Sequence, residues 1–252
     1  MNIPRSLLFI TGLAALPPLA TAQLTWTNAG ADYLFSNSAN WAGNIVPNSG
    51  ADLSLASSDF VGLDNGGDFL ANSLTIQSGV SGAFLPAGAE TLSLGSGGIS
   101  NLGSGIDFQV ALNVTASQTW HVGSGTFLLN NLLGIASGAV LTINVGSGAW
   151  FDFAMAGDNP DWFGAINFTG DLTGASLFAN GTGFTAQKLS QITLDGVAAQ
   201  LDGNRFVTGS VPTAVPEPST YALTAGGALL CLALTRRIRA RRIRTSNLPA
   251  TI

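Results

Sequence analysis

Short apolar runs separated by Gly and Ser fill the middle of this 252-residue chain, and they limit its fold more than any other feature. Residues 91–94, 118–122 and 140–145 are each followed directly by Gly-Ser-Gly. Within these runs, and at 106–110, polar and apolar residues alternate, as they do in half-buried strands. No long segment has helical spacing, and the abundant Gly and Asn disfavour helices. The pattern predicts an all-β fold.

The spacing of Ser-Gly pairs indicates a stacked architecture. These pairs fall between residues 78 and 147 at irregular intervals, several of which fit a repeat of roughly twenty residues with two or three short strands. The coils of a parallel β-helix bury a continuous apolar column, with Gly, Asn and Ser at the corners. We therefore expect a parallel β-helix (solenoid) over residues 23–210, with a β-sandwich as the alternative.

Charge is scarce and unevenly distributed, at 9% of residues and a net value of −5. All 14 acidic residues lie between Asp32 and Glu217, where the only cations are Lys188 and Arg205. Such an acidic body is a poor match for nucleic acid, because affinity for nucleic acid comes largely from cations on phosphates. Six arginines gather near the C-terminus: Arg236, Arg237, Arg239, Arg241, Arg242 and Arg244.

The N-terminal segment, 1–22, is typical of a secretory signal peptide. A basic Arg5 precedes an apolar stretch over residues 6–16, and the segment ends in the small-x-small pattern of Ala20 and Ala22 that signal peptidase requires. We expect the Sec export machinery to translocate the chain and signal peptidase to cut after Ala22. Gln23 would then begin the mature chain.

The other end is typical of a transmembrane anchor. Residues 219–235 form an uncharged apolar segment, whose length is near the short end of the membrane-spanning range. A proline-containing linker, residues 211–218, precedes this segment, and the arginine-rich tail, 236–252, follows it. The positive-inside rule places that tail in the cytoplasm and residues 23–218 on the other side of the membrane.

Together, Val215-Pro216-Glu217-Pro218, the apolar segment and the arginine run resemble the PEP-CTERM sorting signal of Gram-negative bacteria. The resemblance implies that an exosortase recognises the membrane-anchored precursor, with Glu217 as the acidic recognition residue. It also implies a cut near the Pro-Glu-Pro motif and release to the cell envelope, the surface or the extracellular matrix.

Residues 91–145 resemble the autotransporter-associated β-strand repeats of adhesin-like surface proteins and PEP-CTERM proteins. This resemblance implies a non-enzymatic protein of the cell surface, the biofilm or the exopolysaccharide matrix, with extracellular polysaccharide as a partner. A carbohydrate-binding or adhesin-like module is the alternative, and a polysaccharide-active enzyme is the third class.

The two ends of the body suggest caps. The aromatic residues Trp26, Tyr33, Phe35 and Trp41 would plug the N-terminal end of the solenoid, and the alternative is a sugar-stacking platform. At the other end, Thr185 is placed to cap a short helix. Residues 194–207 would then form a closing hairpin, with its turn at 202–204.

Candidate catalytic groups are few. His121 is the one histidine and Cys231 the one cysteine, so sites built on several His or Cys are excluded by count, and we expect neither a cofactor nor a catalytic residue. His121 is expected to lie on the surface. Two acidic groups fit turn chemistry better than catalysis, although paired carboxylates or Ca²⁺ ligands stay open as alternatives: Asp59, Asp64 and Asp68, and Asp152, Asp158 and Asp161.

Overall fold

The computed structural model describes residues 23–154, 161–180 and 184–208, all of which belong to one compact unit. Strands dominate this part of the chain. Its helices are α1 (Ala186–Leu189) and two single-turn 3-10 helices, Ser38–Asn40 and Ala42–Asn44. The predicted all-β class is therefore confirmed.

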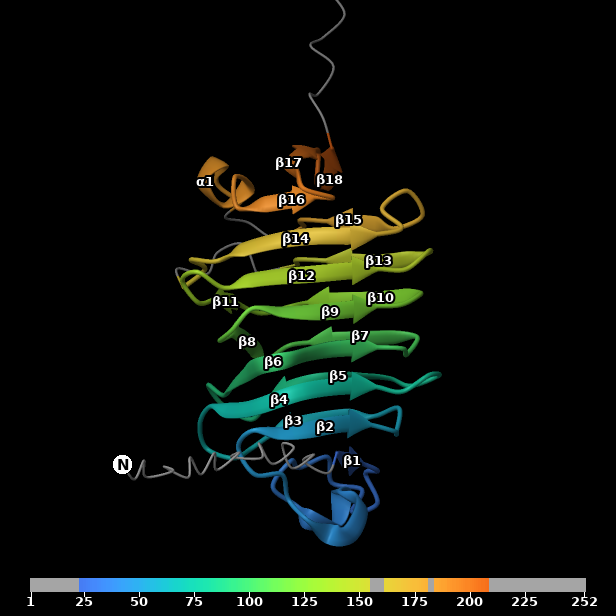
Figure 1. Cartoon of the computed structure of the whole chain (residues 1–252). Helices are drawn as coiled ribbons and strands as arrows, with labels where there is room; N and C mark the ends of the chain where they lie inside the picture. The colour runs from blue at the N-terminus through green and yellow to red at the C-terminus, as the bar shows by residue number, and fades with distance from the viewer. Residues whose placement is uncertain (1–22, 155–160, 181–183, 209–252) are drawn as a thin grey trace, which may run out of the picture. The chain divides into compact units, whose positions relative to one another are not determined.

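The strands stack in three columns around a shared interior, through about six turns (Figure 1). The first column contains the first parts of β4 (Phe69–Ile76) and β6 (Thr91–Asn101), followed by β8 (Ala111–Val114) and β11 (Leu133–Ile135). The second contains β1 (Leu24–Trp26), β2 (Ala51–Leu55), the last parts of β4 and β6, β9 (Gln118–Val122), β12 (Val140–Val145), β14 (Ala165–Gly170) and β16 (Ile192–Leu194). The third contains β3 (Phe60–Leu63), β5 (Ser81–Pro86), β7 (Gly105–Phe108), β10 (Gly125–Leu129), β13 (Ala149–Asp152) and β15 (Ser176–Phe178).

Pairing between successive turns is parallel in every column, which confirms the β-helix and excludes the β-sandwich. The residues aligned across a ladder lie one turn apart in sequence, and the length of a turn varies along the chain. It is shorter where Leu94 pairs with Val114 than where Ile135 pairs with Trp162. The predicted repeat of roughly twenty residues thus corresponds to the shorter turns.

Alternation within the strands builds the core. In the second column, Trp120, Ile143 and Phe168 lie in register on successive turns, and all three side chains are fully buried. Phe rings also stack along the axis, with Phe127 and Phe151 parallel at a centroid distance of 5.0 Å. Burial of one such side chain stabilises the fold by about 1.5–3 kcal/mol, so the stacked column supplies most of the driving force.

Glycine is required where two backbones approach closely. Gly98, in the bend of β6 between the first and second columns, has φ +65°, and a Cβ there would clash with the carbonyl oxygen of Thr119 on the next turn. No larger side chain fits without moving a strand. Glycine between the apolar runs therefore also allows neighbouring turns to pack closely.

The N-terminal end is closed by aromatic side chains, as predicted. Trp26, Phe35 and Trp41 are each at most 2% exposed, and the Trp41 ring meets the other two edge-on at 5.1 and 5.0 Å. Tyr33 differs from the prediction, because it is 42% exposed and lies against Phe60 instead. We call Trp26, Phe35 and Trp41 the N-terminal plug.

The C-terminal end also matches its prediction. Thr185 accepts a hydrogen bond from the backbone N–H of Lys188 and so caps α1. Strands β17 (Val197–Asp202) and β18 (Arg205–Thr208) form the expected antiparallel hairpin, with Gly203 in a left-handed conformation in the turn. Since β17 also pairs antiparallel with β16, the parallel ladder ends here.

No helix among the described residues is long and apolar enough to cross a membrane. The predicted signal peptide, linker, transmembrane segment and basic tail, at residues 1–22, 211–218, 219–235 and 236–252, lie outside the described residues. They therefore stay predictions.

Candidate binding surfaces

The outer face of the second column is mainly polar. Strand alternation puts the apolar partners inside, so the intervening hydroxyl, amide and imidazole side chains lie on the outer face, one on each turn, although Ser54 is fully buried there. The aligned residues of one row are Thr25, Ser54, Thr75, Ser100, His121, Asn144 and Thr169.

His121 lies on this face, exposed as predicted, at the edge of a shallow groove of about 410 Å³. Hydroxyl groups of Ser100, Thr119 and Thr142 also line the groove, and its lining includes no carboxylate. A Ser-His-Asp arrangement needs a carboxylate to orient the imidazole. The groove therefore presents polar side chains but does not assemble a triad.

The three residues of the first acidic group lie within one turn, on the loops that flank β3 and precede β4. Asp59 accepts a hydrogen bond from Asn28 Nδ2 at 2.9 Å, and Asp64 accepts from the backbone N–H of Ser36 at 2.8 Å. Each carboxylate thus ties a loop to the N-terminal turns. In the described ranges, no three His, Cys, Asp or Glu side chains are grouped so that they could hold a metal ion.

The carboxylates of the second acidic group do not share one site. Asp152 is 7% exposed and accepts from Asn180 Nδ2 at 2.6 Å, whereas Asp161 is exposed and Asp158 lies outside the described residues. One residue from each group, Asp68 and Asp161, lines a groove of about 310 Å³ along the first column. Sequence reasoning did not pair these two, since they are separated by several turns.

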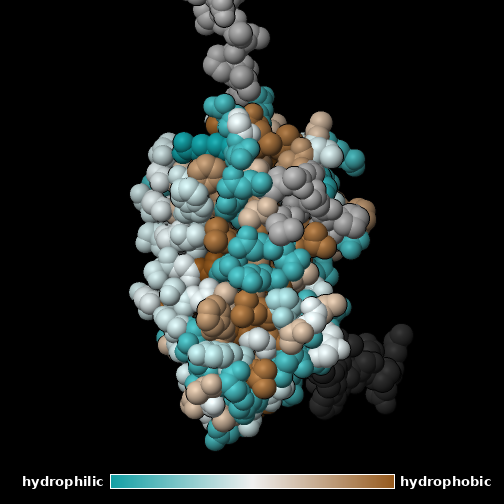
Figure 2. Space-filling view, turned by 180° about the vertical axis from the view of Figure 1, so that it is seen from behind, coloured by the Kyte–Doolittle hydropathy of each residue, from teal (hydrophilic) through white to brown (hydrophobic). Residues whose placement is uncertain are grey.

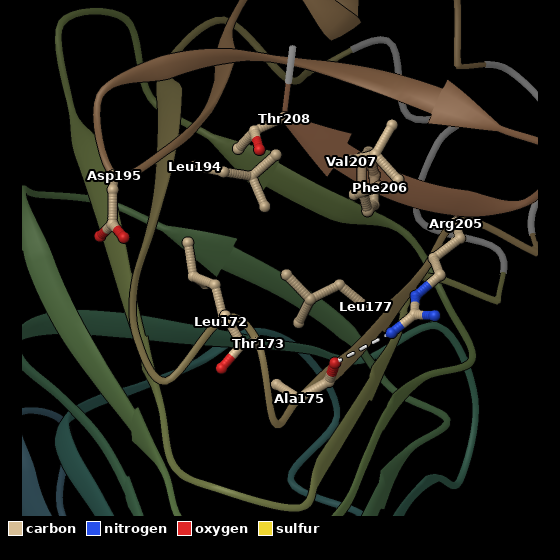
Figure 3. Close-up of a pocket in the computed structure, with 10 residues that line it drawn as sticks. All are labelled: Leu172, Thr173, Ala175, Leu177, Leu194, Asp195, Arg205, Phe206, Val207 and Thr208. Atoms are coloured by element: carbon tan, nitrogen blue, oxygen red, sulfur yellow. Dashed lines mark hydrogen bonds between the residues drawn. The ribbon is translucent and has the colours of Figure 1, made fainter. Parts of the chain in front are cut away.

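A cavity of about 440 Å³ lies beneath the C-terminal hairpin (Figure 3). Leu172, Leu177 and Leu194 project into its centre, while Asp195 and Arg205 stand on opposite sides. The Arg205 guanidinium donates to the carbonyl oxygen of Ala175 at 3.3 Å, which links the hairpin to the residue before β15. The lining of the cavity is largely aliphatic and includes neither a histidine nor a second carboxylate, so the cavity offers no acid–base pair.

Exposed hydrophobic side chains lie among the polar ones on the rear of the solenoid (Figure 2). All the tryptophans fall in the described ranges, and each is buried except Trp150. Trp150, on the outer face of β13, is 43% exposed. The predicted alternative of a sugar-stacking platform at Trp26 and Trp41 is wrong, because both rings are buried in the plug.

Of the predicted sorting and processing residues, Gln23 is described. It is exposed, and its Nε2 donates to Thr75 Oγ1 at 3.2 Å. Ala20, Ala22, residues 215–218 and the six tail arginines lie outside the described residues. In comparisons with known proteins, no family model, curated protein or solved structure matches this chain.

Proposed function

We propose that this chain is an exported, non-enzymatic protein of the cell surface or exopolysaccharide matrix, sorted by an exosortase through its C-terminal signal. The observation on which this proposal depends is the ordered set of Val215-Pro216-Glu217-Pro218, an apolar segment of membrane-spanning length and an arginine run. Each part alone is common, whereas the three in this order are specific.

The described body is compatible with such processing at both ends. Strand β1 begins at Leu24, so a cut after Ala22 removes no residue of the solenoid. At the other end β18 finishes at Thr208, and the proposed exosortase cut near Glu217 leaves the closing hairpin intact. A body that is capped at both ends does not need the anchor in order to bury its core.

The first test follows the location of the protein in cells that have an exosortase. Deletion of residues 214–252 should divert the protein to the soluble secreted or periplasmic fraction, as measured by fractionation and immunoblotting. An unchanged surface location after the deletion would refute the sorting proposal.

A second test uses a single residue. Glu217→Gln should leave uncleaved precursor in the membrane fraction, because the proposed recognition depends on one carboxylate between two prolines. Asp202→Asn is the matched control, since it removes one exposed carboxylate from the nearby hairpin turn and should be processed normally. Equal processing of wild type and Glu217→Gln would contradict the assigned role of Glu217.

A further inference from the structure

We propose that Trp150 and Phe178 form an aromatic platform that binds a neutral polysaccharide. Trp150 on β13 is 43% exposed, and Phe178 on the next turn packs against it, with ring centroids 4.4 Å apart and planes 30° apart. This inference is independent of how the protein is sorted, because it concerns binding by the solenoid itself.

The residues around Trp150 leave part of its ring open to solvent. In the ladder of the third column its neighbours on the adjacent turns are Thr126 and Ser176, both small and half-buried. Its neighbours along β13, Ala149 and Phe151, point into the core. The indole therefore contributes little to the interior, unlike the other tryptophans, and tryptophan is enriched where a protein contacts a partner with the large face of its ring.

Fixed amide groups border the aromatic pair. Asn180, which follows Phe178 closely in the chain, donates through Nδ2 to Asp152 Oδ2 at 2.6 Å, and Asn204 Nδ2 donates to Asn180 Oδ1 at 3.0 Å. Both asparagines are exposed. Because an amide has two donor hydrogens and two acceptor lone pairs, each side chain keeps free capacity for a ligand while held in place. A pyranose ring presents an apolar C–H face and peripheral hydroxyl groups, which matches this combination.

The acidic charge of residues 23–208 indicates which class of polysaccharide the platform would bind. Every acidic residue except Glu217 lies in residues 23–208, against two cations, Lys188 and Arg205. An anionic polymer would be repelled by this body, and two cations do not compensate for that repulsion. The ligand class that fits both the rings and the charge is therefore an uncharged glycan.

The test measures binding of the full chain, purified in a non-ionic detergent without a sugar headgroup. The probe is amorphous cellulose, with affinity taken from co-sedimentation, and soluble hydroxyethylcellulose serves for fluorescence. Trp150→Ala should weaken binding about tenfold, since it removes the stacking ring. Trp150→Phe should keep an intermediate affinity. The matched control is Phe60→Ala, which removes another exposed aromatic ring of the same column, and it should bind like wild type.

Fluorescence supplies a readout specific to this site. Acrylamide should quench wild-type fluorescence mainly through Trp150, and hydroxyethylcellulose should protect it, whereas alginate, an anionic polymer, should not. Trp150→Ala should melt at the wild-type temperature, which separates loss of binding from loss of fold. Equal cellulose binding by wild type and Trp150→Ala, or binding to alginate alone, would overturn the proposal. So would concentration-dependent self-association that Trp150→Ala abolishes without any glycan binding, because it would assign the rings to a second copy.

Discussion

The two ends of the solenoid close the apolar core in different ways. At the N-terminal end, a loop folds back so that Trp41 bridges antiparallel to Trp26, and the plug is fixed by directional hydrogen bonds. At the C-terminal end the strands themselves reverse direction, and Phe153, Phe184 and Phe206 meet edge-on beneath them. Either device stops a further copy from adding to the open ladder.

Asn40 is the centre of the N-terminal hydrogen bonds. It is fully buried; its Nδ2 donates to Asp32 Oδ1 at 2.6 Å and to the carbonyl oxygen of Leu34 at 2.9 Å, while its Oδ1 accepts from the backbone N–H of Gly30 at 2.9 Å. The C-terminal cluster is instead built from rings, which tolerate small shifts. We infer that the N-terminal end depends on exact geometry and the C-terminal end on apolar volume.

The largest expected effect is at Trp41. Trp41→Ala should lower the free energy of unfolding by about 4 kcal/mol, because it removes a buried indole and its 2.9 Å hydrogen bond to the carbonyl oxygen of Phe35. Phe206→Ala should cost about 3 kcal/mol, from packing alone. Denaturant melts of both variants measure the difference. A larger loss for Phe206→Ala would reverse the comparison.

The second prediction tests the hydrogen bonds of Asn40 separately from packing. Asn40→Asp keeps the shape of the side chain, but a carboxylate cannot donate to the carbonyl oxygen of Leu34, and it faces the carboxylate of Asp32. We therefore expect the free energy of unfolding to fall by about 2–3 kcal/mol at pH 7. Asn180→Asp is the comparison variant, because it also sets a second carboxylate against an existing one, Asp152, but Asn180 is exposed where Asn40 is fully buried, so its loss should be smaller. Equal melting temperatures for the two variants would show that burial of Asn40 is unimportant.

Alternation made the strands accessible to prediction, and a local signal did the same for the helix of the C-terminal cap. Residues 118–122 and 140–145 were expected as strands and are β9 and β12, and the Thr185 cap was found because an N-cap is a local signal. Trp150 carried a similar signal, since it alternates with the buried Phe151 in a strand that follows Gly-Ser-Gly. Its exposure was therefore open to prediction and was missed.

Contacts between turns were not open to prediction. The sequence separation of aligned residues changes from turn to turn, so a sequence cannot tell which residues become neighbours on adjacent turns. The shared groove of Asp68 and Asp161 and the contact of Asn180 with Asp152 both depend on this register. The N-terminal plug was open to two interpretations for a related reason, since a loop without alternation does not indicate which side of a ring faces solvent.

The smallest expected effect is on the stability of the fold at low pH. Hydrogen bonds from Asn40, the backbone N–H of Leu34 and Asn37 lower the pKa of Asp32 below its ordinary value of 3.8, and those from the backbone N–H of Gly174 and the Thr173 hydroxyl lower the pKa of Asp171 in the same way. Since the pKa of each carboxyl is lower in the folded than in the unfolded state, its stabilisation is present above about pH 4 and is lost as the pH falls through the folded-state pKa.

We therefore expect Asp32→Asn and Asp171→Asn each to reduce stability slightly at pH 7 and to make the melting temperature fall less steeply between about pH 5 and about pH 3, two pH values that bracket the ordinary pKa. The change should be greater for Asp32→Asn, because its partner Asn40 is buried at the centre of the N-terminal hydrogen bonds, whereas Asp171 closes an exposed turn. Thermal melts across this pH range measure both slopes. Identical slopes for wild type and Asp32→Asn would mean that the N-terminal end depends on packing as much as the C-terminal end does.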